Sequence, residues 1–225
     1  MERLLYHGSD HVVQAPRFGE GKPYNDYGRG FYCTEHRDMA AEWAVGVDHD
    51  GWVNAYRLDM AGLFVVDLNA PEFCTLNWLA VLLEHRLFDV RTPLAAEARA
   101  YLVRHFAVNL SEADVVEGYR ADDSYFAFAQ DFINGAISYR QLCRAMMLGD
   151  LGRQVMVKSP RAFEQLSFEA AQPASRTDWL SRRLVRDRTA RSAYFDGTRN
   201  ARRPDDLFIT QIIDQGLEAG DARLR

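Results

Sequence analysis

Three short segments combine side chains that can hydrogen-bond a ligand with glycines and aromatic rings. Residues 5–9 have the sequence LYHGS, residues 25–34 have NDYGRGFYCT, and residues 154–159 have QVMVKS. A fourth segment, ADD at 121–123, adds two adjacent carboxylates. Taken singly, each has a structural interpretation, because histidines after strands are often structural, tyrosines fill cores and aspartates cap helices. The four segments together, in this order, carry a functional hypothesis.

Several other kinds of site are not indicated. His7 and His11 are four residues apart, but Gly8 and the loop context exclude a helical metal-binding pair, and no third ligand follows. The GRG at 28–30 lacks the third glycine and the following helix of a dinucleotide-binding turn. Cys33 precedes a helix, but no partner histidine is indicated, and a small buried thiol is the simpler interpretation. We therefore expect no bound metal.

The four segments resemble ADP-ribosyltransferases of the His–Tyr–Glu branch, a superfamily that includes diphtheria-type toxins and poly-ADP-ribose polymerases. A helix with Ala41, Trp43 and Ala44 follows the second segment, as it does there. The chain looks closest to an uncharacterised bacterial family of that superfamily, over roughly residues 4–168. The resemblance implies an α+β fold with an ADP-ribosyltransferase-like split, bent β-sheet core and flanking helices.

The resemblance also assigns roles to residues. Such enzymes break the bond between nicotinamide and ribose in NAD through a positively charged ribosyl group. His7 would hydrogen-bond a ribose hydroxyl, Gly8 would leave room for the nicotinamide carboxamide, and Ser9 would add a polar contact. Tyr32 would stack on the pyridinium ring, with Tyr27 beside it.

Gln154 takes the third motif position, where the best-known members have glutamate. Glutamine can bond the ribose hydroxyl, but it cannot oppose the positive charge of the reacting ribose. We expect Asp122 or Asp123 to supply that charge, and Glu164 is the alternative third-motif residue if the alignment is displaced. Arg29 is expected either to reach the NAD pyrophosphate or to face solvent.

The expected strands and helices must bring these motifs together. Strands are predicted at 4–6, 31–33, 52–58, 63–68, 115–118 and 154–158, and helices at 35–45, 75–87, 94–105, 126–135 and 139–148, with a short helix or turn at 162–166. Strands and helices do not alternate regularly, which favours an α+β class. Only a common sheet could unite the three motif strands, so we expect a cleft lined by His7, Tyr32 and Gln154.

Composition limits the setting. The chain has 225 residues, 48% of them hydrophobic and 26% charged, with a net charge of −5, which is typical of globular proteins. No apolar run could cross a bilayer, no signal peptide is evident, and the three cysteines are widely spaced. We therefore expect a cytoplasmic protein without a membrane partner.

Two regions are expected: an NAD-binding catalytic domain at 1–170 and an arginine-rich extension at 171–225 that packs on or beside it. Lysine is nearly absent from the chain, and arginines crowd residues 176–203. Arg182, Arg183, Arg186 and Arg188 are expected to face an anionic partner, and a solvated helix face is an equally good interpretation.

The resemblance implies a mono-ADP-ribosyltransferase that uses NAD to modify a protein or nucleic acid, and the sequence offers no metal site. Small bacterial members of the superfamily often act as toxins under the control of an antitoxin, so the resemblance also implies an inhibitor protein. Two alternatives stay open. The protein could be an NAD glycohydrolase that uses water as acceptor, or a catalytically weak module that binds NAD or nucleic acid.

Overall fold

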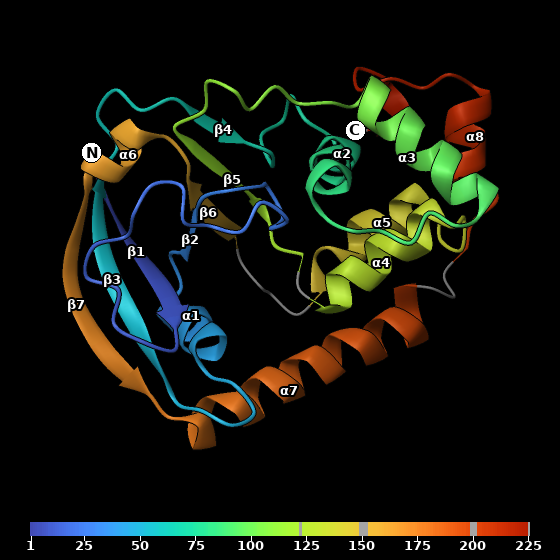
Figure 1. The fold of residues 1–225 in the computed structure, drawn as a ribbon. Helices are drawn as coiled ribbons and strands as arrows, with labels where there is room; N and C mark the ends of the chain where they lie inside the picture. The colour runs from blue at the N-terminus through green and yellow to red at the C-terminus, as the bar shows by residue number, and fades with distance from the viewer. Residues whose placement is uncertain (122, 149–152, 199–201, 225) are drawn as a thin grey trace.

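The fold is α+β, as the sequence predicts, in a computed structural model that describes residues 1–121, 123–148, 153–198 and 202–224. These residues form eight α-helices around a seven-stranded mixed sheet (Figure 1). The strands in the sheet order β4-β5-β6-β2-β1-β3-β7 are Val65–Asp67, Val115–Tyr119, Arg153–Val157, Phe31–Thr34, Glu2–Ser9, Gly51–Asp59 and Leu166–Ala174. Among these neighbours, β4 and β5 pair in parallel and the others pair antiparallel.

The sheet parts between β1 and β2. Strand β1 pairs with β3 along its whole length, and β2 pairs with β6 in the same way. By contrast, β1 and β2 are in register only at Tyr6 and Thr34. The sheet therefore has two well-paired parts, β4-β5-β6-β2 and β1-β3-β7, which diverge from each other beyond that one pair.

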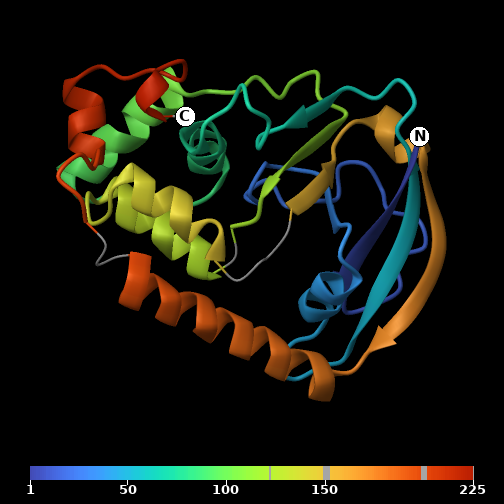
Figure 2. The same cartoon turned by 180° about the vertical axis from the view of Figure 1, so that it is seen from behind.

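Five helices gather on one side of the molecule, where Figures 1 and 2 show them grouped beyond β4, β5 and β6. They are α2 (Thr75–His85), α3 (Pro93–His105), α4 (Asp123–Ile133), α5 (Tyr139–Ala145) and α8 (Ile209–Asp214). Their apolar faces form the main core with Val66, Val116 and Met156 of the sheet. Since successive strand residues face opposite sides, Val115 and Val155 point the other way, into a smaller core that α6 (Pro160–Glu164) covers.

Helix α1 (Arg37–Ala44) packs directly on β1. A Cβ atom at Gly8 would lie 1.9 Å from the carbonyl oxygen of Ala40, so only glycine permits this approach. Helix α7 (Arg176–Ala193) follows β7 and adds Trp179 and Leu180 to a third cluster, with residues of α1 and β3. In Figures 1 and 2, α7 runs from the end of β7 to the five-helix group.

The end of α7 continues into a π-helical turn, Tyr194–Thr198, and a 3-10 turn, Ala222–Leu224, lies near the C-terminus. None of the helices in the described residues is both long and apolar enough to span a membrane.

Most expected elements are present, with boundaries shifted by a few residues. The helix predicted at 94–105 is α3, and the strand predicted at 52–58 is β3. The helix predicted at 35–45 is α1, which starts at Arg37, and the hydroxyl of Thr34 accepts a hydrogen bond from the backbone N–H of His36 at 3.2 Å. Strand β7 was not predicted, and the expected domain boundary at 170/171 falls inside it.

Candidate functional site

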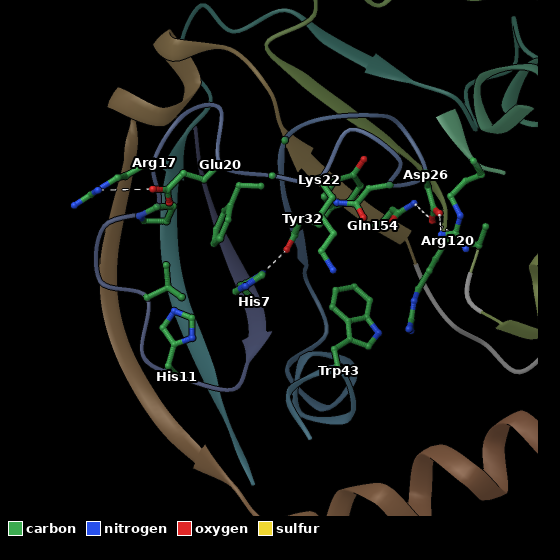
Figure 3. A pocket seen from close by; sticks show the side chains of 18 of the residues that line it. His7, His11, Arg17, Glu20, Lys22, Asp26, Tyr32, Trp43, Arg120 and Gln154 are labelled. Atoms are coloured by element: carbon green, nitrogen blue, oxygen red, sulfur yellow. Dashed lines mark hydrogen bonds and ion pairs between the residues drawn. The ribbon is translucent and has the colours of Figure 1, made fainter. Parts of the chain in front are cut away.

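A cavity of about 740 Å³ lies where β1 and β2 part, and its volume is within the roughly 300–1,000 Å³ of small-molecule sites. Its lining includes His7 of β1, Tyr32 of β2 and Gln154 of β6, so the structure brings together the three residues that the sequence predicts to share a cleft (Figure 3). The loop between β1 and β2 supplies much of the remaining lining. Side chains from α1, α7 and the ends of α2 and β5 complete it, namely Trp43, Arg183, Arg86 and Arg120.

The cavity reaches both faces of the sheet. Tyr32 packs against the main core on the helical side, whereas its neighbour Phe31 packs with the smaller core on the opposite side. Both residues line the cavity. A ligand in this opening would therefore touch residues that an unbroken sheet would keep on opposite faces.

His7 is held in one tautomer by the backbone of β2. Its Nδ1 atom lies 2.7 Å from the carbonyl oxygen of Tyr32, so Nδ1 must carry the proton that it donates. Burial lowers the pKa of His7 below its usual value, and the bond to Tyr32 opposes this only in part. The ring is therefore neutral at pH 7, and its Nε2 atom is an acceptor.

Tyr32 fixes the loop that precedes it. Its hydroxyl accepts a hydrogen bond from the backbone N–H of Tyr27 at 2.9 Å and donates to the carbonyl of Gly28 at 2.7 Å. Gly28 has a φ of +84°, in the left-handed region that favours glycine. Burial raises the pKa of Tyr32, so the hydroxyl keeps its proton and the ring is presented rigidly to the cavity.

Gln154 is bound through its amide nitrogen. Nε2 donates to Asp26 Oδ2 at 2.9 Å and to the carbonyl oxygen of Tyr119 at 3.2 Å, as Figure 3 shows in part. These two acceptors fix the orientation of the amide group. Because the oxygen is the only acceptor of an amide, a ligand hydroxyl that donates to Gln154 must meet Oε1.

Asp26 is a site residue that the sequence did not reveal as one. Besides Gln154, its carboxylate accepts hydrogen bonds from Arg86 at 2.8 Å and from the backbone of Ala121 at 2.9 Å. The side chain is almost fully buried and lines the cavity. Asp26 thus joins the β1–β2 loop to β6, to the end of α2 and to the segment after β5.

Three carboxylates are candidates for the site: Asp122 and Asp123 for its negative charge, and Glu164 as the alternative third-motif residue. Asp122 lies outside the described residues, as does the side chain of Asp123, although Ala121, just before them, lines the cavity. Glu164 is exposed at the end of α6 and lies outside the lining, so the geometry favours Gln154 over Glu164 for the third-motif position. Within the described chain, no group of three or more His, Cys, Asp or Glu side chains is arranged to hold a metal ion.

Gly8 and Ser9 lie outside the lining and have structural contacts. Gly8 is required by the packing of α1, as described above. The hydroxyl of Ser9 donates to the carbonyl of His11 at 2.7 Å and accepts from Asn54 Nδ2 at 2.9 Å. Asn54 is fully buried, also accepts from the backbone of Val13 at 2.9 Å, and so anchors the start of the loop that walls the cavity.

Tyr27 and Arg29 also lie outside the lining. Tyr27 is buried, and its hydroxyl donates to the carbonyl of Tyr119. Arg29 is exposed and donates to the carbonyl of Gly19, within its own loop. Of the two expectations for Arg29, the structure therefore favours a surface position that stabilises the loop.

Positive charge predominates among the described lining residues. The lining carboxylates each have an arginine partner: Arg17 with Glu20 at 3.7 Å and Arg86 with Asp26 at 2.8 Å. Lys22, Arg120 and Arg183 add further positive charges to the lining. Since the whole chain carries a net charge of −5, this local excess of cations distinguishes the cavity and would favour an anionic ligand over a cationic one.

Residues 3–168 match a protein family that is described as a protein of unknown function (DUF3990). The chain belongs to this family. No curated protein and no solved structure matches the chain. The DUF3990 region contains His7, Tyr32, Asp26 and Gln154, and it ends within β7, so α7 with Arg183 lies beyond it.

Proposed function

We propose that the protein binds NAD in this cavity and transfers its ADP-ribose group to a macromolecule. The observation that carries the proposal is that His7, Tyr32 and Gln154, which are distant in sequence, line one cavity. These are the residues to which the resemblance to the His–Tyr–Glu ADP-ribosyltransferases assigns the NAD site. The parting of β1 from β2 supports it further, because that superfamily implies a split, bent sheet.

The neutral state of His7 suits contact with a sugar. With Nδ1–H donated to the carbonyl of Tyr32, Nε2 can accept a hydrogen bond from a ribose hydroxyl. The ring of Tyr32, whose hydroxyl is bonded to the loop, offers its face to the positively charged pyridinium ring. In the proposed complex the nicotinamide half of NAD therefore lies near β1 and β2.

Gln154 would act at the reacting ribose. Its Oε1 atom accepts a hydrogen bond from a hydroxyl of the nicotinamide ribose. The bond between the ribose C1′ and the pyridinium nitrogen breaks, and its electron pair leaves with neutral nicotinamide. A nucleophilic oxygen or nitrogen of the acceptor then bonds to C1′ and releases its proton.

The developing positive charge on the ribose needs a carboxylate nearby. Asp26 is next to Gln154, but Arg86 balances its charge, so we assign Asp26 a positioning role. Asp122 and Asp123 stay the proposed source of negative charge. They follow Ala121, which lines the cavity and donates its backbone N–H to Asp26.

One observation favours a second candidate, a weakly catalytic NAD-binding module. The third-motif side chain is a neutral amide, whose nitrogen is bound to Asp26 and Tyr119. Such a group can hold a hydroxyl without adding negative charge at the reacting carbon. In that case the protein would bind NAD and release little or no nicotinamide.

The deciding experiment incubates the purified full-length chain with NAD and measures free nicotinamide. Bacterial lysate fractions and NAD labelled in the adenosine are then added, and label attached to protein or nucleic acid is measured. Nicotinamide release with labelled acceptor supports the transferase, and release without labelling indicates a glycohydrolase. NAD binding without release indicates the binding module, and absence of both binding and release contradicts the proposal.

A further inference from the structure

Helix α7 contributes one of its many arginines to the cavity. Arg183 lines the cavity, although it lies outside the DUF3990 region. The arginines next to it on α7 have partners outside the cavity. Arg182 stacks on Trp179, with its guanidinium carbon 4.6 Å from the ring centre, and Arg186 forms an ion pair with Glu42 of α1.

The position of Arg183 is fixed by contacts on both sides of it. Before it, Trp179 and Leu180 pack into the cluster formed with α1 and β3. After it, Arg186 Nε donates to Glu42 at 2.9 Å, and Asp187 accepts a hydrogen bond from Ser124 of α4. Arg183 is therefore held at the cavity by a helix that is attached to both α1 and α4.

Two more cations line the same cavity from other elements. Arg120 follows β5, and its guanidinium lies over the ring of Trp43, with its carbon 4.3 Å from the ring centre. This contact holds the guanidinium in place at the cavity. The indole N–H of Trp43 is buried and has no hydrogen-bond partner within the described residues. Lys22 projects into the cavity from the β1–β2 loop (Figure 3). Within the part of the chain that the structure describes, neither Lys22 nor Arg183 forms a direct ion pair, although Asp187, which is bonded to Arg191 and Ser124, interacts electrostatically with Arg183.

We propose that α7 completes the ligand site and that Arg183, together with Lys22 and Arg120, binds the diphosphate of a nucleotide. Arginine matches phosphate oxygens through paired N–H donors, and lysine adds a compact charge. The unpartnered N–H of Trp43 supplies a further donor for a ligand oxygen. The proposal rests on the proposed function for the identity of the ligand as NAD, but the diphosphate contact can be tested without any reaction.

The experiment titrates the full-length protein with ADP, and separately with inorganic pyrophosphate, by isothermal calorimetry. Arg183→Ala should weaken ADP binding roughly ten- to a hundredfold, the scale of a lost charged hydrogen bond. Arg183→Lys should recover part of the loss. Arg188→Ala is the matched control, because Arg188 is exposed on the same helix outside the lining, and it should bind ADP like the parent.

The outcomes separate this proposal from the proposed function. Arg183-dependent binding of ADP by a protein that never releases nicotinamide supports the diphosphate site and contradicts the transferase. Nicotinamide release with equal ADP affinity in Arg183→Ala and Arg188→Ala supports the transferase and overturns the role of α7. A parent protein that binds neither ADP nor pyrophosphate also overturns it.

Discussion

At the scale of single residues, the cavity depends on one buried carboxylate, Asp26. Its two oxygens accept hydrogen bonds from a guanidinium, a backbone amide and a side-chain amide. A buried carboxylate without such partners would be strongly destabilising. The three bonds therefore hold the β1–β2 loop against the end of α2, the segment after β5, and β6. The orientation of Gln154 is a consequence of this arrangement.

The pairing of Asp26 with Gln154 leads to a prediction about catalysis. Gln154→Ala should lower nicotinamide release about 10²–10³-fold and leave NAD affinity within about tenfold, because the contact should strengthen in the transition state. Gln154→Glu would place a second carboxylate against Asp26, at a position where Gln154 Nε2 is now 2.9 Å from Oδ2. Two touching carboxylates cannot both ionise, so this variant should also lose activity.

Exchanging the two groups is the matched control. In the double variant Asp26→Asn with Gln154→Glu, an amide again faces a carboxylate, and part of the activity lost in Gln154→Glu should return. Nicotinamide release by the parent, Asp26→Asn, Gln154→Glu and the double variant forms a double-mutant cycle. A Gln154→Glu variant that is more active than the double variant would show that Asp26 does not control this position.

His7 gives a prediction about pH. Because burial lowers its pKa in the folded protein, the unfolded chain binds a proton at a higher pH than the folded chain does. The contribution of neutral His7 to stability is fully present above the unfolded pKa of about 6.5 and is lost as the pH falls toward the lower folded value. The free energy of unfolding should therefore decrease as the pH is lowered below about 6.5.

The measurement is urea denaturation between pH 5 and 8 for the parent, for His7→Gln and for His36→Gln, which changes an exposed histidine. The decrease below pH 6.5 should be smaller in His7→Gln than in the other two proteins. Identical pH profiles in the parent and His7→Gln would contradict the prediction.

The residues on strands could be predicted from the sequence, and those held by distant contacts could not. His7, Tyr32 and Gln154 belong to short motifs with apolar strand residues around them, so local pattern and resemblance found them. Asp26 appeared as one polar residue in a glycine-rich loop. Its partners Arg86, Ala121 and Gln154 are 60, 95 and 128 residues away, and no local pattern indicates such contacts.

At the scale of elements, α7 is predicted to depend on its contact with α1. Glu42 is nearly buried and is paired with Arg186. Arg186→Ala would leave that carboxylate without its partner, and such a loss typically costs about 3–5 kcal/mol. We expect a decrease of that order in the free energy of unfolding, measured by urea denaturation.

The control for this prediction removes both charges. The double variant Glu42→Gln with Arg186→Met leaves no unpaired buried charge and should be clearly more stable than Arg186→Ala. Arg182→Ala, on the exposed face, should stay within about 0.5 kcal/mol of the parent. If Arg186→Ala were equally mild, the ion pair with Glu42 would not be needed to hold α7 on α1.

Strand β7 was not predicted because its own residues do not favour a strand. Its sequence, LSFEAAQPA, has two adjacent alanines and a proline, which are poor strand formers. Pro173 is tolerated because β7 is an edge strand, paired with β3 on one side only. The pairing with β3 also shifts register between Ala55 and Tyr56, so no simple alternation runs through the strand. Its formation therefore depends on β3 and not on its own residues.

At the scale of the whole molecule, the segment after residue 168 is part of the cores that the rest of the chain forms. Residues 170–174 of β7 pair with β3, and Ala174, Trp179 and Leu180 complete the cluster around α1. Farther along, Ile209, Ile212, Leu217 and Leu224 are almost fully buried in the main core with α2 to α5. The described residues after 168 therefore contribute to two of the cores of the molecule, which is more contact than a terminal appendage makes.

These contacts predict that the DUF3990 region does not fold alone. Burying one leucine or isoleucine contributes roughly 1.5–3 kcal/mol, so the four apolar side chains contributed by residues 209–224 approach the whole stability of a typical domain, about 5–15 kcal/mol. A chain cut after residue 168 should therefore lack a cooperative thermal transition in circular dichroism and should not bind ADP. Co-expression of residues 169–225 as a separate chain should restore both properties, because the missing strand and helices can then pack in place. A cut chain that unfolds cooperatively within a few degrees of the parent would instead show that the segment is an independent addition, and ADP binding by that cut chain would show that Arg183 is dispensable for binding.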